Sequence, residues 1–261
     1  MLKRIFTFFY QWLVFAPIFL VITILTALTT MAGCWLGGER IFAYYPGMIW
    51  SRLTCRLALC PVKVKGREKL NRSRSYVFIA NHQGAFDIFL IYGFLGFPIK
   101  WIMKKSLRSI PFVGAACESA GFVFVDNSTP KAAAKTIAIA EKRLAKGASL
   151  MIFPEGARTK DGYMHRFMKG AYQMAVDLKL PVVPITINGT YEVLPIGSLF
   201  LRPHRLELAI HDPFLINGYT SKDIPDMIDI TRKTIYNGLW EKYKDTVENS
   251  NGVVSKAGIP L

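Results

Sequence analysis

Short apolar runs recur along the chain from about residue 60 to residue 211, and turn-forming residues bound each of them. Runs of this length that are rich in Val, Ile and Phe are typical of buried β-strands. We therefore predict seven strands, at Val62–Lys65, Tyr76–Ala80, Ile99–Met103, Gly121–Val125, Ser149–Phe153, Val182–Ile187 and Arg205–His211.

Segments with helical features fill the gaps between these runs. The clearest is Pro130–Lys146, where Thr129 is the expected N-cap, Pro130 takes the first position and Gly147 ends the helix. The other predicted helices are Asp87–Leu95, Lys169–Leu180 and about Ile224–Tyr243. Strands that alternate with helices predict a single α/β domain, with a mostly parallel or mixed seven-stranded sheet flanked by helices.

The N-terminal region has a different pattern, because no charged residue occurs from Ile5 to Gly38. A helix of about 20 apolar residues is enough to cross a bilayer, and this stretch is longer. Pro17 and Gly37-Gly38 are natural break points, and a second apolar segment follows at Ile41–Trp50. We therefore expect the domain to be preceded by an N-terminal membrane-embedded helical hairpin.

Basic residues lie on both sides of this stretch. Lys3 and Arg4 precede it, and the cations that follow are Arg40, Arg52, Arg56, Lys63, Lys65, Arg67, Lys69, Arg72 and Arg74. The positive-inside rule then places the bulk of the protein on the cytoplasmic face of a membrane, most simply a bacterial inner membrane. Because both flanks are basic, a re-entrant or interfacial (monotopic) hairpin fits at least as well as a single integral span.

The whole chain is basic, with 33 Lys and Arg against 18 Asp and Glu and a formal net charge of +15. Nucleic acid is a common partner of basic chains, but no nucleic-acid-binding module is recognisable here. The long apolar terminus favours an anionic membrane surface instead. Four cysteines without a Cys-x-x-Cys pair, and histidines 165, 204 and 211 without ligand spacing, predict reduced thiols and no metal site.

Candidate chemistry begins at the segment Asn81-His82-Gln83-Gly84-Ala85-Phe86-Asp87, a His-x4-Asp motif at the end of a predicted strand. A neutral histidine suits a general base near neutral pH, and a carboxylate on its second ring nitrogen would fix the tautomer. Positions i and i+5 diverge by about 140° on a helix, so we expect a turn at Gln83-Gly84 before a helix that starts at Asp87. The alternative is a helix-capping or core His82 beside an ordinary helix-terminal acid.

A second motif, Phe153-Pro154-Glu155-Gly156-Ala157-Arg158-Thr159, ends another predicted strand. Gly156 allows close backbone approach, and Arg158 offers a bidentate grip on phosphate. Glu155 is expected either to order Arg158 or to bind a substrate hydroxyl. The alternative is a turn whose Arg158 is merely solvated. No Gly-x-Ser-x-Gly elbow occurs, which favours direct attack by an acceptor hydroxyl rather than by a serine.

The two motifs together resemble the glycerolipid acyltransferase family, most closely the 1-acylglycerol-3-phosphate acyltransferases. The resemblance implies that His82 is the general base, that Asp87 orients it, and that the block Phe153–Thr159 helps to bind the glycerol phosphate acceptor. It also implies that Lys104 or Lys105 reaches the acceptor phosphate, with Lys169 as a further candidate. Residues 169–171 and 181–185 match a closing motif whose buried strand shapes the acyl-binding side.

On this basis residues 1–58 are the expected membrane-anchoring segment, 59–247 the acyltransferase domain and 248–261 a flexible tail. The expected partners are membrane lipids, lysophosphatidate and an acyl donor, either acyl-CoA or the acylated form of acyl carrier protein. No bound cofactor and no nucleic acid are expected.

The chain departs from the family pattern at two positions. Ala157 stands where Thr or Ser is usual, and Asn127 follows Val125-Asp126 where arginine is usual. The second change removes a permanent charge. Three interpretations stay open: Lys131 or another cation substitutes, Arg158 and the two lysines suffice, or the acceptor is another lysolipid such as a lyso-ornithine lipid. A non-catalytic lipid-binding protein is the remaining alternative.

Overall fold

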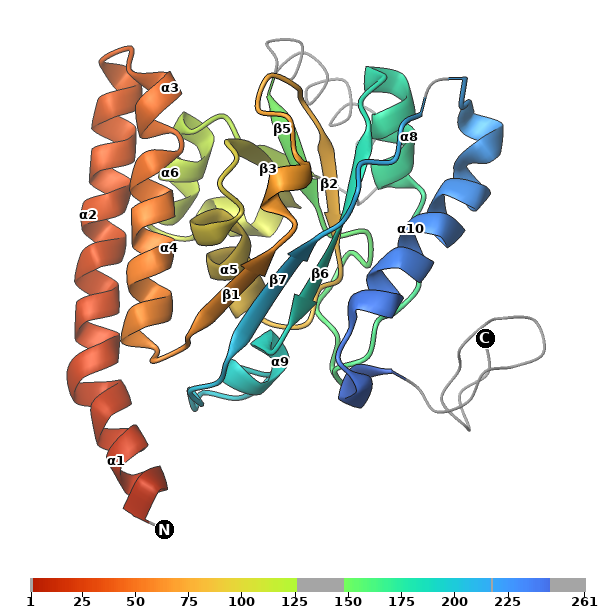
Figure 1. Ribbon diagram of the computed structural model, residues 1–261. Helices are drawn as coiled ribbons and strands as arrows, with labels where there is room; N and C mark the ends of the chain where they lie inside the picture. The colour runs from red at the N-terminus through yellow and green to blue at the C-terminus, as the bar shows by residue number, and fades with distance from the viewer. Residues whose placement is uncertain (1, 126–147, 217, 245–261) are drawn as a thin grey trace.

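A seven-stranded sheet forms the centre of the computed structural model, which describes residues 2–125, 148–216 and 218–244 (Figure 1). The strand order is β1-β7-β6-β2-β5-β3-β4. In chain order the strands are β1 Val62–Lys65, β2 Val77–Ala80, β3 Ile99–Lys104, β4 Val123–Val125, β5 Ser149–Ile152, β6 Val182–Asn188 and β7 Leu206–Ile210. Each predicted strand is confirmed to within two residues at either end.

Neighbouring strands run parallel, with one exception, the antiparallel pair β6 and β7. The expected mostly parallel, mixed sheet is therefore confirmed. The central strands β2, β5 and β6 are buried at every residue. Burial on both faces explains why these strands appear in the sequence as continuous apolar runs rather than as alternating ones.

Helices cover both faces of the sheet (Figure 1). On one side lie α4 (Tyr45–Leu57), α5 (Phe86–Phe94) and α6 (Val113–Ser119), and on the other α8 (Gly170–Leu178) and α10 (Ile224–Gly238). Alternate residues of β2 enter the two cores: Phe78 packs with the α4 and α5 side, and Val77 with the α8 and α10 side. A short helix, α9 (Thr190–Val193), follows β6.

The N-terminal region is a helical hairpin. Segments α1 (Leu2–Tyr10), η1 (Gln11–Phe15) and α2 (Ala16–Trp35) follow one another directly, and α3 (Glu39–Phe42) and α4 return beside α2. Within the described ranges, one helix, Ile5–Trp35, is long and apolar enough to cross a membrane. The chain reverses at Gly37, whose φ is +84°, as the sequence led us to expect.

Pro17 does not break this helix, contrary to expectation. The five residues before α2 form a π-helix, so the backbone is locally wider just ahead of the proline. A proline ring collides with the carbonyl four residues earlier in a regular α-helix, and a π-turn is one of the known ways to relieve that collision. The helix therefore continues through Pro17 and ends at Trp35.

The predicted helix over Ile224–Tyr243 is too long. Helix α10 ends at Gly238, and the backbone of Leu239 and Trp240 is extended before a 3-10 turn at Glu241–Tyr243. The side chain of Asn188, at the end of β6, donates to the Gly238 carbonyl and accepts from the Trp240 N–H. This tertiary contact ends the helix. The predicted helix Pro130–Lys146, Asn127, Lys131 and the tail 248–261 lie outside the described residues.

Candidate active site

The chain leaves β2 at a fixed angle because the buried Asn81 is hydrogen-bonded to β6. Its Nδ2 donates to the Ile187 carbonyl at 2.9 Å, and its Oδ1 accepts from the Ile187 N–H at 2.8 Å. The Asn81 side chain thus pairs both the N–H and the carbonyl of the buried Ile187. Buried backbone groups left without a partner would destabilise the fold. The next residue, His82, starts from a position set by two neighbouring strands.

His82 and Asp87 meet through a tight turn, as predicted. His82 Nδ1 lies 2.6 Å from Asp87 Oδ2, and the same oxygen accepts from the Gly84 N–H at 3.0 Å. Helix α5 begins at Phe86, one residue earlier than expected, and places Asp87 in its first turn. The Asp87 side chain is fully buried, whereas the His82 side chain is 15% exposed. A carboxylate on Nδ1 keeps a proton there and leaves the lone pair on Nε2.

The imidazole is also held from the second motif, because the Phe153 ring stacks on it with centroids 3.8 Å apart. Glu155 accepts from two backbone N–H groups, that of His82 at 2.8 Å and that of His165 at 2.9 Å. The Thr159 N–H donates to the His82 carbonyl at 2.9 Å. The two motifs are therefore joined at His82 itself.

These contacts give Glu155 a role that the sequence did not indicate. Both of its oxygens have backbone partners, so the structure shows a brace between the two motifs. Burial raises the pKa of Glu155 to about 8, while the two backbone donors oppose the shift. A substrate contact of Glu155 stays a prediction.

Thr159 belongs to the same brace. Its hydroxyl donates to Asp161 Oδ1 at 2.6 Å and accepts from the Gly162 N–H at 3.2 Å, and its side chain is buried. Gln83 donates to the Gly162 carbonyl at 3.2 Å. The contacts of Thr159 organise the loop that follows the second motif, and its predicted substrate contact stays a prediction.

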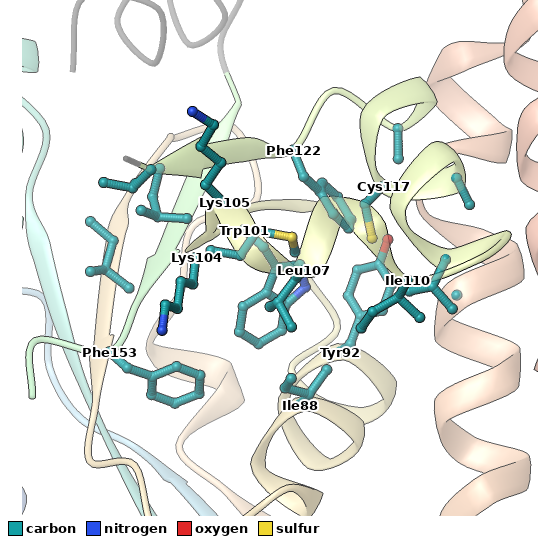
Figure 2. A pocket seen from close by; sticks show the side chains of 18 of the residues that line it. Ile88, Tyr92, Trp101, Lys104, Lys105, Leu107, Ile110, Cys117, Phe122 and Phe153 are labelled. Atoms are coloured by element: carbon teal, nitrogen blue, oxygen red, sulfur yellow. The ribbon is translucent and has the colours of Figure 1, made fainter. Parts of the chain in front are cut away.

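A pocket of about 1100 Å³ opens beside His82. Figure 2 shows side chains that line it, among them Phe153, whose ring stacks on His82. Its walls are mainly apolar and come from elements far apart in the sequence. The lining includes Thr23, Ala27 and Thr30 of α2, Gly47 and Trp50 of α4, Ile88 and Tyr92 of α5, Ala116 and Cys117 of α6, and Gly170, Ala171 and Met174 of α8. It therefore extends from His82 and Phe153 to the N-terminal hairpin.

The candidate cations are divided between the pocket and its surroundings. Lys104 and Lys105 line it, and in Figure 2 the Lys104 ammonium points toward the Phe153 ring while Lys105 points the opposite way. Arg158 and Lys169 are exposed and are not among the described residues of the lining. The structure thus distinguishes the two adjacent lysines, which the sequence did not.

Gly156 lines the pocket with a φ of +74°, a conformation that L side chains rarely adopt. A Cβ there would also meet the end of the Met168 side chain. The predicted closing strand has a different place from the one expected, because the described lining contains no residue of β6. Helix α8, which follows Lys169, supplies that wall instead.

A comparison with known protein families identifies the class of protein to which this fold and these paired motifs belong. The model of the acyltransferase family matches residues 61–188. The chain belongs to the acyltransferase family.

Individual proteins similar to this chain have more specific names than the family. The chain is similar to the chloroplastic 1-acyl-sn-glycerol-3-phosphate acyltransferase LPAT1 of Arabidopsis thaliana, with 32% identity over 177 residues that cover 67% of this chain and 49% of the relative. It thus spans about half the length of that protein. A 1-acyl-sn-glycerol-3-phosphate acyltransferase of Chlamydomonas reinhardtii is 28% identical over 240 residues, 91% of this chain and 70% of the relative.

A solved structure shares the fold over almost its full length. The crystal structure of the 1-acyl-sn-glycerophosphate (LPA) acyltransferase PlsC from Thermotoga maritima matches with a TM-score of 0.77 and 25% identity. The match covers 91% of this chain and 95% of that one.

Proposed function

We propose that this protein is a 1-acyl-sn-glycerol-3-phosphate O-acyltransferase of phospholipid biosynthesis. It would transfer a fatty acyl group from a thioester to lysophosphatidate and so form phosphatidate. The observation that carries the proposal is the position of the His82–Asp87 pair at one end of a large apolar pocket. The similar proteins named above point to the same acceptor.

The proposed mechanism is direct attack by the acceptor hydroxyl. His82 Nε2 takes the hydroxyl proton while the oxygen adds to the thioester carbonyl, and Asp87 stabilises the imidazolium that forms. When the tetrahedral intermediate collapses, the carbon–sulfur bond breaks and the sulfur leaves with the proton from Nε2. No covalent acyl-enzyme is needed, which agrees with the lack of a marked serine nucleophile.

The acceptor phosphate would be held at the same end of the pocket. Of the two lysines that line the pocket, Lys104 faces the Phe153 ring, and Gly156 allows the phosphate to approach the backbone. Lys105, which lines the pocket but points the opposite way, would add charge, as would Arg158 and Lys169 from outside the lining. Arginine contributes a planar fork of donors that matches a phosphate, and lysine a point charge.

The remainder of the pocket suits the acyl chain. Each methylene removed from water contributes about 0.8 kcal/mol, so a long chain gains substantial binding free energy along apolar walls. Because α2 and α4 supply part of these walls, the hairpin would be part of the lipid site as well as an anchor.

The packing of α2 favours an interfacial hairpin over a membrane span. This helix contacts α6 of the α/β domain as well as α4 of the hairpin, so it is not free to cross a bilayer alone. We infer that the hairpin lies in the plane of one leaflet at the cytoplasmic face, with the exposed side chains of α1 and α2 in the acyl-chain region.

Acyl transfer by the purified protein in detergent tests this function. 1-Acylglycerol-3-phosphate should be offered beside lysophospholipids with larger headgroups and a lyso-ornithine lipid, each with acyl-CoA and with acyl-acyl carrier protein. Thiol release with formation of phosphatidate is the expected result. Thiol release with another lysolipid alone would move the substrate and draw attention to Asn127, and no release with any pair would contradict the proposal.

A further inference from the structure

A buried amide in the most apolar part of the chain carries an inference about membrane contact. Gln11 lies in η1 and is only 7% exposed. Its Nε2 donates to the Leu199 carbonyl at 2.5 Å, and its Oε1 accepts from the Leu201 N–H at 2.9 Å. One side chain of the N-terminal helix is thus bonded to the backbone of the segment Pro195–Leu201, here named the docked loop.

The docked loop exposes large apolar side chains although it is held in place. Leu199 is 73% exposed and Phe200 54%, and the Phe200 ring lies 6.2 Å from that of Phe8 in α1. Phe9, Trp12 and Leu13 of the adjoining helix are exposed as well. Apolar residues that gather from two segments and face outward mark a contact surface, whereas scattered single ones do not.

The charges around this surface favour an anionic bilayer as its partner. No acidic residue occurs in residues 5–38 or 194–205; the exposed Arg202 follows the docked loop directly, and the exposed Arg205 comes three residues later. An apolar patch with exposed arginines close by in the sequence suits the boundary between acyl chains and anionic headgroups. The patch is also continuous with the apolar helix Ile5–Trp35, which we have proposed to lie in the same leaflet.

We propose that the docked loop is a second membrane-contact element and that Gln11 couples it to the hairpin. The proposal rests on the membrane-bound enzyme proposed above and adds an orientation to it. A single helix lying in a leaflet can roll about its own axis. A second apolar contact beside that axis prevents rolling and holds the domain at one angle to the lipid from which its acceptor comes.

Depth-dependent quenching tests this contact. Leu199→Cys is labelled with an environment-sensitive fluorophore and mixed with vesicles of phosphatidylcholine and phosphatidylglycerol, with and without nitroxide lipids. Leu25→Cys on α2 and Ile230→Cys on α10, both at exposed apolar positions, are the matched controls. Wild-type protein labelled in the same way gives the background from Cys34, Cys55, Cys60 and Cys117. We expect blue-shifted, quenched emission at positions 199 and 25 and neither change at 230.

The opposite results overturn the proposal in distinguishable ways. Quenching at 25 without quenching at 199 leaves the hairpin in the membrane and removes the docked loop from it. No quenching at either position, with acyl transfer intact in detergent, rejects membrane contact but keeps the enzyme. An emission shift at 199 that grows with protein concentration without vesicles assigns the surface to a second copy of the chain.

A change at Gln11 tests the coupling separately. Gln11→Met keeps the length of the side chain but loses both hydrogen bonds to the docked loop. Hydrogen exchange at the Leu201 amide should then become roughly fivefold faster or more. Quenching at 199 should fall while quenching at 25 does not. Gln173→Met on α8 should change neither quantity, and unchanged exchange at Leu201 in Gln11→Met would overturn the coupling.

Discussion

One oxygen of Asp87 accepts hydrogen bonds from both His82 Nδ1 and the Gly84 N–H. The carboxylate therefore holds the ring and the turn that carries it at the same time. Its negative charge would stabilise the imidazolium formed during proton transfer, which a neutral group of the same shape cannot do.

Asp87→Asn should therefore lower kcat by roughly 10²–10⁴-fold, the range of general base catalysis, with little change in the KM for the lysolipid. Thermal unfolding should show that the fold is retained. Asp229→Asn, at an exposed position on α10, is the matched control and should keep full activity. A kcat within twofold of the wild type for Asp87→Asn would mean that the carboxylate does not assist the base.

Glu155 should make the free energy of unfolding decrease as pH rises. Its pKa rises from 4.5 to about 8 on folding because burial disfavours the ionised form. The stabilisation from the protonated carboxyl is complete below pH 4.5, where both states hold the proton. It declines as pH rises toward 8, because the unfolded chain releases a proton that the folded chain retains.

The free energy of unfolding of the wild type relative to Glu155→Gln should therefore fall between about pH 4.5 and 8 and level off above that range. Chemical denaturation at several pH values measures this difference. Gln has one acceptor oxygen and one NH2 donor at the end of its side chain, so it cannot accept from both backbone N–H groups as the two Glu155 oxygens do. The variant should therefore also be less stable at pH 5. A difference that rises with pH would contradict the raised pKa.

Among single residues, the sequence predicted contacts between side chains that lie close together in the chain. The His82–Asp87 contact spans five positions and needs only a turn. The partners of Glu155 lie 73 and 10 positions away and are backbone groups, which carry no signature in the side-chain pattern. For the same reason nothing in the sequence marked Asn81 as the link between β2 and β6.

At the element scale, the turn between β2 and α5 is confined by helix α9. A Cβ on Gly84 would lie 2.6 Å from the Thr190 carbonyl oxygen, which belongs to the backbone and cannot rotate away. The close approach of these two segments fixes where Asp87 enters the site.

Gly84→Ala should therefore destabilise the fold by about 1–3 kcal/mol and reduce acyl transfer, since the turn must shift. Gly170→Ala is the matched control, because a Cβ there meets no atom within 4 Å. The free energy of unfolding of Gly170→Ala should equal or slightly exceed that of the wild type. Equal melting temperatures for the two variants would show that the turn tolerates the displacement.

Helices and strands could be predicted where neighbouring residues in the sequence determine them, and could not where a distant residue does. Short runs rich in Val, Ile and Phe identified all seven strands, and the runs are most continuous in β2, β5 and β6, which are buried at every residue. The end of α10 was not predictable, since the Asn188 side chain imposes it from another element. The continuation through Pro17 depends on a π-turn, for which the sequence gives no rule.

At the scale of the whole molecule, the hairpin and the sheet share one core. Tyr44 and Cys55 of the hairpin region pack in the same cluster as Phe78 and Leu90. A hairpin attached in this way would keep its N-terminus on the same side of a bilayer as the domain.

A fluorophore on the N-terminal amine and one at Ile230→Cys should therefore be reduced equally by external dithionite when the protein is bound to preformed vesicles. A single membrane span would protect the N-terminal label and leave the other exposed. Detergent added at the end makes every label accessible and serves as the control. Selective protection of the N-terminal label would contradict the interfacial hairpin.

The most direct test of the central claim is the rate of acyl transfer by His82→Ala, compared with His165→Ala. Both histidines contact Glu155 through their backbone N–H groups, but only His82 lines the pocket. We expect a loss of roughly 10²–10⁴-fold in kcat for His82→Ala, with lysolipid binding retained, and a small effect for His165→Ala. A folded His82→Ala protein with near-normal turnover would contradict it.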